Sequence, residues 1–231
     1  MIDFKIFSFD KLSSTHQKIE EYNNYPYVCV VAKEQDMGRG RNGRTFVSEV
    51  GGLYTSIAFD VDDNATNSPL YVLYIGVACA NALKKQGIKC KLKFPNDLIY
   101  KGKKLGGIIC KCNLTGDKIT RIVAGIGINV NNEISEEIKE IAINLKAENI
   151  DKELLLQDIL LEIKNTVIGG EKRLILEEYK RLSNTLNKEI SVNCRPKIVG
   201  KAIDLDDFGF LLVQTENGIK RVSYGDITHE E

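Results

Sequence analysis

The segment GRGRNGRTFVSEVGGLY, residues 38–54, places three arginines and three glycines in its first seven residues and then becomes apolar and β-prone. Glycine lets backbone N–H groups approach an anion closely. The guanidinium groups of Arg39, Arg41 and Arg44 can donate paired hydrogen bonds to a phosphate or a carboxylate. The pattern therefore predicts an anion-binding loop that leads into a strand at residues 53–59. Taken alone, the loop is also compatible with nucleic-acid binding or with a flexible surface turn.

Length and composition limit the number of domains and the kinds of partner that this chain can have. A chain of 231 residues suits one large domain, or one domain of about 180 residues with a small appendage. Lys and Arg together number 32, as do Asp and Glu, so the formal net charge is zero. This balance argues against the broad polyanion-binding surface of a DNA-coating protein. We therefore expect a local anion site and no nucleic-acid partner.

The sequence predicts a cytoplasmic protein with no membrane partner. It contains no run near the roughly 18 apolar residues of a membrane span, and its N-terminus lacks the features of a signal peptide. Six cysteines without a framework spacing fit a reducing compartment, with Cys29, Cys79 and Cys90 as small core residues. Cys110 and Cys112 would share one face of a strand, and structural burial is favoured over a metal site because no second ligand pair accompanies them.

The pattern of apolar residues in the first half of the chain predicts a sheet packed with helices. The predicted elements, in chain order, are a strand at 3–9, a helix from 13–15 to about Tyr22, strands at 27–32 and 53–59, a polar turn at 60–67, and a long helix from Ser68 to about Gly87. Next come a strand at 89–94, a turn around Gly102, and a hairpin of strands at 106–113 and 118–130. Residues 131–145 are ambiguous and are expected to contain a mobile loop.

The second half predicts two helices and a small β-barrel. Asp151 is expected to cap the first helix, and the second spans about 171–183. The segments EISVNC, IVGKAIDLD, GFLLVQT and KRVSYGD then read as short strands separated by turns. The predicted fold class is therefore α+β, a mixed β-sheet packed with helices plus a small C-terminal barrel. The predicted domains are residues 1–185 and 186–231.

A second candidate binding segment is KFPNDLIYKGKKLGGIICK, residues 93–111. It presents Lys93 at a strand end, then Asn96 and Asp97 in a turn begun by proline, then Lys103 and Lys104. A carboxylate between lysines suits a metal-bridged triphosphate, with Asp97 holding Mg²⁺ and the lysines neutralising phosphate charge. An ordinary β-turn with solvated lysines explains the local sequence equally well.

The third segment is GIGINVNN, residues 125–132, in which an apolar strand is interrupted by glycines and ends in asparagines. Gly125 and Gly127 would let a ligand or a neighbouring backbone approach closely, and Asn129 could offer its amide to a nucleotide or to metal-bound water. A bulged strand that ends in an Asn-rich turn is the alternative.

Together the three segments resemble the biotin protein ligases. The matching pattern is G-R-G-R-x-G-R followed by an aromatic residue, Ser48 and G-G-L-Y, then K-[aromatic]-P-N-D with K-x-G-G-I-I after it, and then G-I-G-I-N-V. These motifs occur in the family's order and spacing across residues 13–132. The chain departs from the family at Phe46 and Phe94, where tryptophan is usual, and at His16, where asparagine is common.

The resemblance implies a class II synthetase-like catalytic domain with an SH3-like C-terminal barrel, and it implies a two-step reaction. The biotin carboxylate attacks the α-phosphate of ATP, which gives biotinyl-5′-AMP and pyrophosphate. A lysine of a biotin carboxyl carrier domain of a biotin-dependent carboxylase then displaces AMP. Mg²⁺ accompanies ATP in this reaction, and homodimers are common among such proteins. No enzyme nucleophile is required, so positioning and charge stabilisation are the expected means of catalysis.

The resemblance also assigns roles to individual residues. Lys104 and Arg41 are the expected catalytic charge stabilisers. The positions expected to contact biotin are Ser14, Thr15, His16, Gln35, Arg39, Gly40, Arg41 and Lys104. Those expected on the ATP and adenylate side are Arg39, Arg44, Lys93, Asn96 and Asn129, with Asp97 on the metal.

Three alternatives differ in class. A lipoate or other acyl-adenylating ligase of the same fold is disfavoured because the loop of residues 38–48, called the Arg/Gly loop below, follows the pattern of the biotin protein ligases. A biotin-sensing DNA-binding repressor would need an N-terminal domain, and the first predicted strand begins at about Ile2, so the ligase-only form is expected. A non-catalytic biotin-binding or biotin-sensing protein is disfavoured by the presence of Arg41, Lys104 and Asp97 together.

Overall fold

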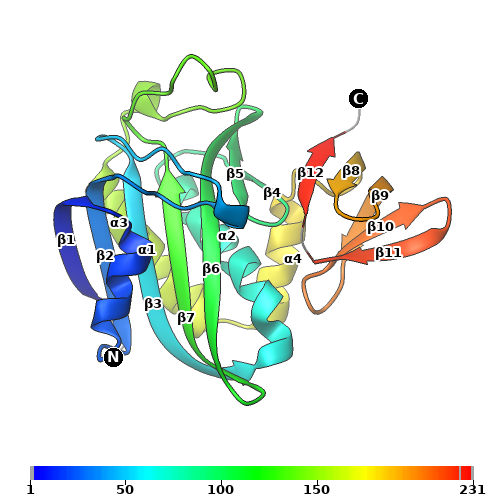
Figure 1. Cartoon of the computed structure of the whole chain (residues 1–231), viewed down its shortest axis with the longest axis horizontal. Helices are drawn as coiled ribbons and strands as arrows, with labels where there is room; N and C mark the ends of the chain where they lie inside the picture. Colours follow the sequence, from blue (N-terminus) through cyan, green and yellow to red (C-terminus); the bar gives the residue numbers. More distant parts are fainter. Residues whose placement is uncertain (1–2, 224, 230–231) are drawn as a thin grey trace.

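The computed structural model describes residues 3–223 and 225–229, which form a seven-stranded mixed sheet flanked by helices and a five-stranded antiparallel sheet near the C-terminus (Figure 1). The strand order of the large sheet is β1-β2-β3-β7-β6-β5-β4. Strands β1 and β2 are parallel, whereas the other neighbours are antiparallel. The bounds of the seven strands are β1 Lys5–Leu12, β2 Tyr27–Gln35, β3 Leu53–Asn64, β4 Lys91–Lys93, β5 Asp97–Tyr100, β6 Lys103–Thr115 and β7 Lys118–Ile128. The α+β prediction is confirmed.

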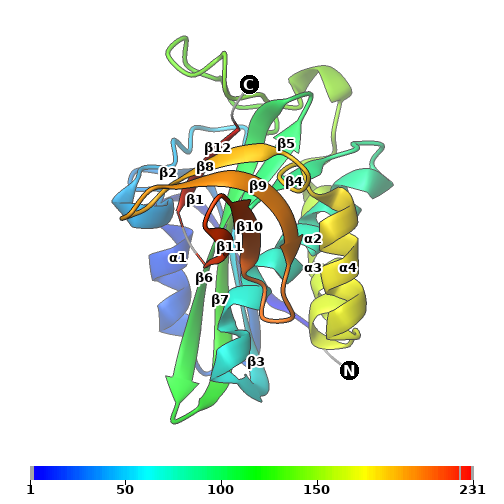
Figure 2. The ribbon, with the colours of Figure 1, turned by 90° about the vertical axis from the view of Figure 1, so that its right-hand side faces the viewer.

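Helices cover both faces of the large sheet (Figure 2). The short helix α1 (Thr15–Lys18), continued by the 3-10 turn η1 (Ile19–Tyr22), packs on β2, β3 and β7. Three longer helices lie on the opposite face: α2 Ser68–Lys85, α3 Lys152–Glu162 and α4 Lys172–Leu182. The side chain of Asp151 accepts a hydrogen bond from the backbone N–H of Leu154 at 2.9 Å, which confirms the predicted N-cap of α3.

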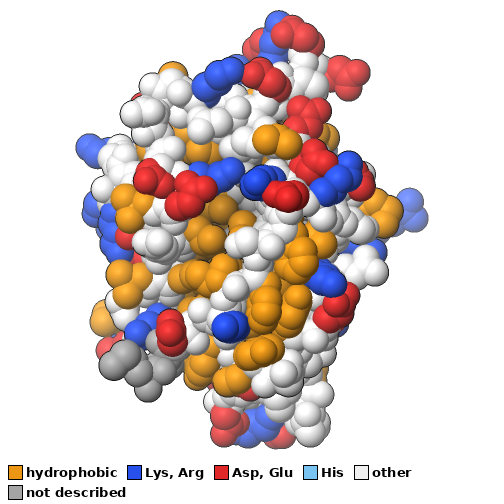
Figure 3. All heavy atoms as spheres, turned by 90° about the vertical axis from the view of Figure 1, so that its left-hand side faces the viewer, with side chains coloured by type: hydrophobic (Ala, Val, Ile, Leu, Met, Phe, Trp, Pro, Cys, Tyr) orange, Lys and Arg blue, Asp and Glu red, His pale blue; other side chains and the backbone are white. Residues whose placement is uncertain are grey.

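The two helix layers explain why the central strands are apolar without alternation. Residues 53–59 of β3 are all buried, because one side of the strand faces α1 and the other faces α2. Tyr54, Ile57 and Phe59 are fully buried there. At the β1 edge, by contrast, hydrophobic side chains reach the surface between charged ones (Figure 3). Ile6 on β1 and Leu154 on α3 are among the exposed large hydrophobic residues.

The polar turn predicted at residues 60–67 is wrong for its first five residues. Strand β3 continues to Asn64 and pairs with β7 through Asp60, Asp63 and Asn64. The partner strand supplies Arg121, which forms an ion pair with Asp60 and donates to the carbonyl of Tyr25 at 2.9 Å, while Asp62 and Asp63 pair with Lys118 and Lys172. The chain turns only at η3, Ala65–Asn67.

The second sheet has the strand order β11-β10-β9-β8-β12 and lies where the small barrel was predicted. Its strands are β8 Glu189–Asn193, β9 Ile198–Leu205, β10 Leu211–Thr215, β11 Gly218–Val222 and β12 Asp226–His229. The prediction that KRVSYGD forms one strand is wrong, because β11 ends at Val222 and β12 pairs instead with β8. The change of partner requires a break between the two strands, and Gly225, with a φ of 128°, lies in that break.

Two connections tie the C-terminal sheet to the elements of the large sheet. The segment that follows α4 forms a bridge from Ser183 to Leu92, and the hydroxyl of Thr185 accepts a hydrogen bond of 3.0 Å from the backbone N–H of Phe94. Lys180 of α4 pairs with Asp204 of β9 at 3.0 Å. The turn between β4 and β5, which carries Asn96, is thus held from the side of the C-terminal sheet, whereas Asp97, predicted in this turn, is the first residue of β5.

All six cysteines are free, and Cys29, Cys79 and Cys90 are buried as predicted. Burial raises the pKa of Cys90 to about 12, so this thiol is neutral at physiological pH. Among the helices that the structure describes, none is both long and apolar enough to span a bilayer.

Candidate functional site

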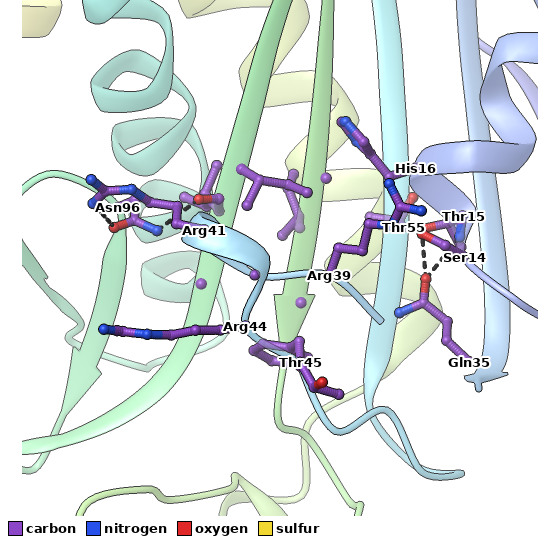
Figure 4. Close-up of a pocket in the computed structure, with 18 of the residues that line it drawn as sticks. Ser14, Thr15, His16, Gln35, Arg39, Arg41, Arg44, Thr45, Thr55 and Asn96 are labelled. Carbon is purple, nitrogen blue, oxygen red and sulfur yellow. Dashed lines mark hydrogen bonds between the residues drawn. The ribbon is translucent and has the colours of Figure 1, made fainter. Parts of the chain in front are cut away.

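A cavity opens on the α1 side of the large sheet, beneath the loop of residues 38–46 (Figure 4). Strands β6 and β7 form its floor, the end of β2 and the start of α1 form one wall, and the turn before β5 forms the other. The lining residues are Ser14, Thr15, His16, Gln35, Arg39, Gly40, Arg41, Arg44, Thr45, Phe46, Thr55, Asn96, Asp97, Lys104, Gly107, Ile108, Ile109, Gly125, Ile126 and Gly127. They include all the predicted site residues except Lys93 and Asn129.

One end of the cavity is a network of neutral hydrogen-bonding groups. The side-chain oxygen of Gln35 accepts hydrogen bonds from the backbone N–H of Thr15 at 2.8 Å and from its hydroxyl at 3.0 Å. The Gln35 amide donates to the hydroxyl of Ser48 at 2.9 Å, which in turn donates to the carbonyl of Phe46 at 2.8 Å. These bonds fix the orientation of the Gln35 amide. Ser14 is buried, its side chain makes no helix-capping bond, and it faces the same end of the cavity.

The Arg/Gly loop folds back on itself so that its cations face the cavity. The backbone N–H of Gly40 donates to the carbonyl of Arg44 at 2.7 Å, and Asn42 and Gly43 adopt left-handed conformations with φ of 56° and 74°. A guanidinium nitrogen of Arg41 donates to the side-chain oxygen of Asn96 at 3.0 Å. Figure 4 shows Arg41 and Asn96 meeting at one side of the cavity and Arg39 extending toward Thr55 at the other.

Lys104 and Asp97 form an ion pair at the cationic end of the cavity. The ammonium of Lys104 lies 2.7 Å from a carboxylate oxygen of Asp97. The backbone of Lys104 is fixed separately, because its N–H donates to the carbonyl of Ile141 at 2.8 Å and its carbonyl accepts from the N–H of Ile143 at 2.9 Å. The Lys104 side chain is 43% exposed, so it can reach a substrate without leaving a packed core.

Glycines in β7 leave room on the floor of the cavity. A Cβ atom at Gly127 would lie 2.7 Å from the ring of Phe46, and one at Gly125 would lie 2.8 Å from Ile109 and 3.2 Å from Nδ1 of His16. Both glycines are therefore closely approached, but by side chains rather than by the backbone that was the predicted alternative, and the approach of a ligand stays a prediction. Phe46 packs edge-on against Tyr54, with ring centroids 6.3 Å apart, and so joins the loop to the sheet.

His16 lies over Gly125 with its Nδ1 atom buried and without a hydrogen-bond partner among the described residues. Burial lowers the pKa of His16, and the nearby cations Lys111 and Arg39 act in the same direction, against the carboxylate of Glu20. Glu20 is itself paired with Lys111 at 2.7 Å. The imidazole is therefore held mainly in its neutral form.

The charges in the cavity favour an anion at one end and an uncharged polar group at the other. Arg39, Arg41, Arg44 and Lys104 line it, and Asp97 is the only acidic side chain among the described lining residues. Guanidinium and ammonium groups around a partly enclosed site stabilise phosphate or carboxylate charge. The Thr15 and Gln35 end suits a ligand that both donates and accepts hydrogen bonds, such as a urea or an amide.

Comparison with known proteins agrees with this geometry. Residues 8–129 match the model of the biotin/lipoate A/B protein ligase family, and residues 185–229 match that of the biotin protein ligase C-terminal domain. The chain belongs to the biotin/lipoate A/B protein ligase family. The resemblance drawn from the sequence motifs is confirmed.

Several relatives of this ligase family can be compared over most of their length. The bifunctional ligase/repressor BirA of Bacillus subtilis is 34% identical over an alignment that covers 94% of this chain and 72% of that protein. The biotin–[acetyl-CoA-carboxylase] ligase of Mycobacterium tuberculosis is 26% identical, with 87% and 79% covered. The biotin protein ligase from Aquifex aeolicus in complex with biotin and ATP is 30% identical, with a TM-score of 0.81 and 98% of each chain covered.

Two residues assigned from the ligase motifs lie outside the cavity. Lys93 ends β4 opposite Asp97 in the strand register but does not line the cavity. Asn129 is buried, donates to the carbonyl of Ile143 at 3.2 Å and accepts from Asn132 at 3.1 Å, so its amide holds the loop of residues 131–145. Their roles toward ATP stay predictions.

Sequence reasoning did not assign several residues that line the cavity. This group includes Thr55 on β3, Phe46 in the loop over the cavity, and Ile108 and Ile109 on the floor. Thr55 could have been found as a polar residue inside a strand that is otherwise apolar, because such a residue needs a hydrogen-bond partner. Its hydroxyl donates to the carbonyl of Val30 at 3.0 Å.

Proposed function

We propose that this chain is a biotin protein ligase that activates biotin with ATP and transfers it to a lysine of a biotin carboxyl carrier domain. The observation that carries the proposal is the meeting, in one cavity, of the Thr15 and Gln35 hydrogen-bonding end with the Arg41 and Lys104 cationic end. Biotin has a ureido ring at one end and a carboxylate at the other. The ring would occupy the neutral end, which leaves the carboxylate among the cations.

The first step is the attack of a biotin carboxylate oxygen on the α-phosphorus of ATP. A bond forms between this oxygen and the phosphorus, the bond to the bridging oxygen breaks, and pyrophosphate leaves. Negative charge accumulates on the α-phosphate in the transition state. Lys104 and Arg41 would stabilise that charge, and Lys104 would exchange its contact with Asp97 for contacts with the reacting groups.

The second step transfers the biotinyl group to the carrier. The neutral amine of the carrier lysine attacks the acyl carbon of biotinyl-5′-AMP, an amide bond forms, AMP leaves, and the amine gives up a proton. The Arg/Gly loop would keep water away from the mixed anhydride until the lysine arrives. The chain supplies no nucleophile in either step, which fits a cavity rich in cations and backbone N–H groups.

Mg²⁺ would enter as part of its complex with ATP. The described residues contain no group of three or more His, Cys, Asp or Glu side chains that could hold a metal ion without the nucleotide. Asp97 fits a more limited role, because Mg²⁺ on a nucleotide commonly takes one or two protein carboxylates and completes its shell with phosphates and water. Asp97 would bind the metal when Lys104 turns to the substrate.

The location of the reaction, the domain division and the oligomeric state are further parts of the proposal. We place the reaction in the cytoplasm, where ATP is available and where a reducing environment suits six free cysteines. The division into residues 1–185 and 186–231, and a homodimer, stay predictions. Light scattering on the purified protein measures the oligomeric state.

Biotin-dependent exchange of labelled pyrophosphate into ATP tests the proposed function, with lipoate in a parallel reaction. Exchange with biotin alone is the expected result. Exchange with lipoate would instead identify a lipoate-type ligase, and a lack of exchange with either acid would contradict adenylation by this chain. Labelled biotin transfer to a purified carrier domain tests the second step separately.

A further inference from the structure

Cys110 and Cys112 lie two residues apart on β6, so both thiols point to the same face of the sheet. This face is opposite to the candidate site and packs against α2, where the sulfur of Cys112 lies 4.0 Å from the carbonyl oxygen of Ser68. Both residues are only partly buried, unlike the three core cysteines. The proposed reaction uses neither thiol.

The two thiols are neighbours on this face of β6 and influence each other's ionisation. The neighbouring thiol raises the pKa of Cys110, with burial acting in the same direction, and lowers the pKa of Cys112 against the effects of burial and of Asp63. Two thiols at neighbouring positions on one face of a strand can bind one atom together, which cysteines on distant elements cannot do.

A second cavity, of about 340 Å³, reaches Cys110 from the side of the candidate site. Cys110 lines it together with Val72 of α2, Pro95 and Gly209 of the C-terminal sheet. It is more than twice the volume of the roughly 150 Å³ cavities that accept a benzene ring in proteins. A thiol-bound group as large as a phenyl ring therefore has room.

The second cavity passes around the edge of β6 toward the candidate site. Strand β5 pairs with β6 only up to Gly107, and beyond it the described part of the chain places no further strand on that side of β6. Arg41 and Asn96, which are hydrogen-bonded to each other, line both cavities. A group that fills the second cavity would therefore lie against this pair.

We propose that Cys110 and Cys112 form a two-thiol binding site for soft, thiol-seeking centres, of which trivalent arsenic is the representative. Sulfur ligands select soft centres. With an organic arsenic(III) oxide, two As–S bonds form, two S–H bonds and the As=O bond break, and one water molecule leaves. No oxidant or reductant is needed, because arsenic and sulfur keep their oxidation states. The remaining substituent on arsenic projects into the second cavity.

The site offers two protein ligands, so it does not surround a bound atom with protein groups on all sides. The described residues contain no third His, Cys, Asp or Glu that would complete a metal cluster here. An arsenic atom bound to two sulfurs and one carbon fits such an open site, because three bonds complete its valence. A bound group beside Arg41 should also slow the adenylation step, and this part of the inference rests on the proposed function.

Phenylarsine oxide is the probe for the binding site. The wild-type protein and the variants Cys110→Ser, Cys112→Ser and Cys194→Ser are treated with one equivalent and then with excess monothiol, and the adduct is measured by native mass spectrometry. We expect one adduct per chain that resists monothiol but is released by 2,3-dimercaptopropanol. It should persist in Cys194→Ser, the control in the second sheet, and disappear in the other two variants.

Two results would overturn the binding site. One is a wild-type adduct that monothiol removes as readily as it does from the single variants. The other is a resistant adduct that survives in the Cys110→Ser/Cys112→Ser double variant. Circular dichroism confirms that each variant is folded.

Pyrophosphate exchange on the same samples tests the link to the candidate site. We expect the arsenical to lower exchange by at least about tenfold in the wild type, to leave the double variant unaffected, and to lose its effect after dithiol treatment. A stable adduct with unchanged exchange would overturn the link. A protein that shows no exchange before treatment would count against the proposed function, while the adduct measurement would still decide the thiol site.

Discussion

The ammonium of Lys104 lies 2.7 Å from the carboxylate of Asp97 at the cationic end of the cavity. The two groups neutralise each other before any substrate is present. An incoming anion must compete with Asp97 for Lys104, and a magnesium ion must compete with Lys104 for Asp97. Binding of ATP with its metal would satisfy both groups at once.

Replacing Lys104 with Ala should lower the rate of biotin-dependent pyrophosphate exchange by about 10²- to 10³-fold, as the loss of one charge-stabilising group commonly does. The fold should be preserved because the side chain is half-exposed. Lys103→Ala is the matched control: its ammonium contacts the carbonyl of Lys139 at 2.7 Å, outside the cavity. Near-normal exchange in Lys104→Ala, or an equal loss in Lys103→Ala, would remove Lys104 from the mechanism.

Replacing Thr15 with Val should weaken biotin binding by about 10- to 100-fold, because an unmatched buried polar group costs about 1 to 3 kcal/mol. The substitution removes the hydroxyl that contacts Gln35 and, at 2.9 Å, Ser56. Isothermal titration with biotin measures the effect, and ATP affinity should change little. Thr120→Val, at an exposed position on β7, serves as control. Unchanged biotin affinity would mean that the ring does not lie at this end.

The burial of neutral His16 should make the protein less stable at acid pH. The pKa of His16 is lowered in the folded protein, whereas in the unfolded chain it is about 6.5. As the pH falls below about 6.5, the unfolded state therefore takes up a proton that the folded state does not, and the free energy of unfolding decreases. Above about pH 7.5 this contribution is absent, because both states are neutral.

Urea unfolding of the wild type and of His16→Asn, at pH 7.5 and pH 5.5, measures this contribution. The difference between the two proteins should change by up to about 1.4 kcal/mol between these pH values, because pH 5.5 lies about one unit below the pKa of the unfolded chain. A difference that is the same at both pH values would show that His16 is not buried in its neutral form.

The Arg/Gly loop should become protected from trypsin when the adenylate forms. It offers cleavage sites after Arg39, Arg41 and Arg44 and buries little apolar surface. Saturating biotin and ATP together should slow cleavage in this loop by at least about tenfold. Cleavage at Lys220, on an exposed strand of the C-terminal sheet, supplies the internal control. An unchanged ratio of the two rates would contradict closure of the loop over the ligand.

Replacing Gly127 with Ala should displace the ring of Phe46, because the new Cβ would lie 2.7 Å from it. Overpacking of this kind costs about 1 to 3 kcal/mol of stability. The double variant Gly127→Ala/Phe46→Leu should recover much of the loss in urea unfolding, which a double-mutant cycle quantifies. Gly107→Ala is the control, since its Cβ would meet only ordinary contacts at 3.6 Å. Simple additivity in the cycle would exclude the clash.

Local sequence patterns predicted most elements of this fold and most residues that line the cavity. The start of α1, the Asp151 cap of α3 and the β6–β7 hairpin depend on neighbours in sequence, so periodicity and capping rules were sufficient, although Ser14 makes no side-chain capping bond. Residues 60–64 were assigned wrongly because their place in β3 depends on Arg121, which is about sixty residues away. The end of β11 likewise depends on the pairing of β12 with β8.

Within the candidate site, too, residues that belong to a short motif could be predicted, whereas contacts between distant segments could not. The motifs pointed to Arg41 and Lys104, whereas the position of Asn129 depends on which groups the loop of residues 131–145 offers to its amide. No short pattern contains that information. The packing of Phe46 on Gly127 is similar, because it brings together two motifs whose contact exists only in the folded chain.

The hydrogen bond from Phe94 to Thr185 has a consequence for protein engineering. The proposed boundary after residue 185 looks like a convenient place to cut the gene or to insert a fusion partner. Thr185 is nevertheless fully buried, and its hydroxyl supports the turn that presents Asn96 and Asp97. A truncation that ends before Thr185 would remove the hydroxyl that supports this turn, so a truncated or fused protein should keep Thr185 together with the large sheet.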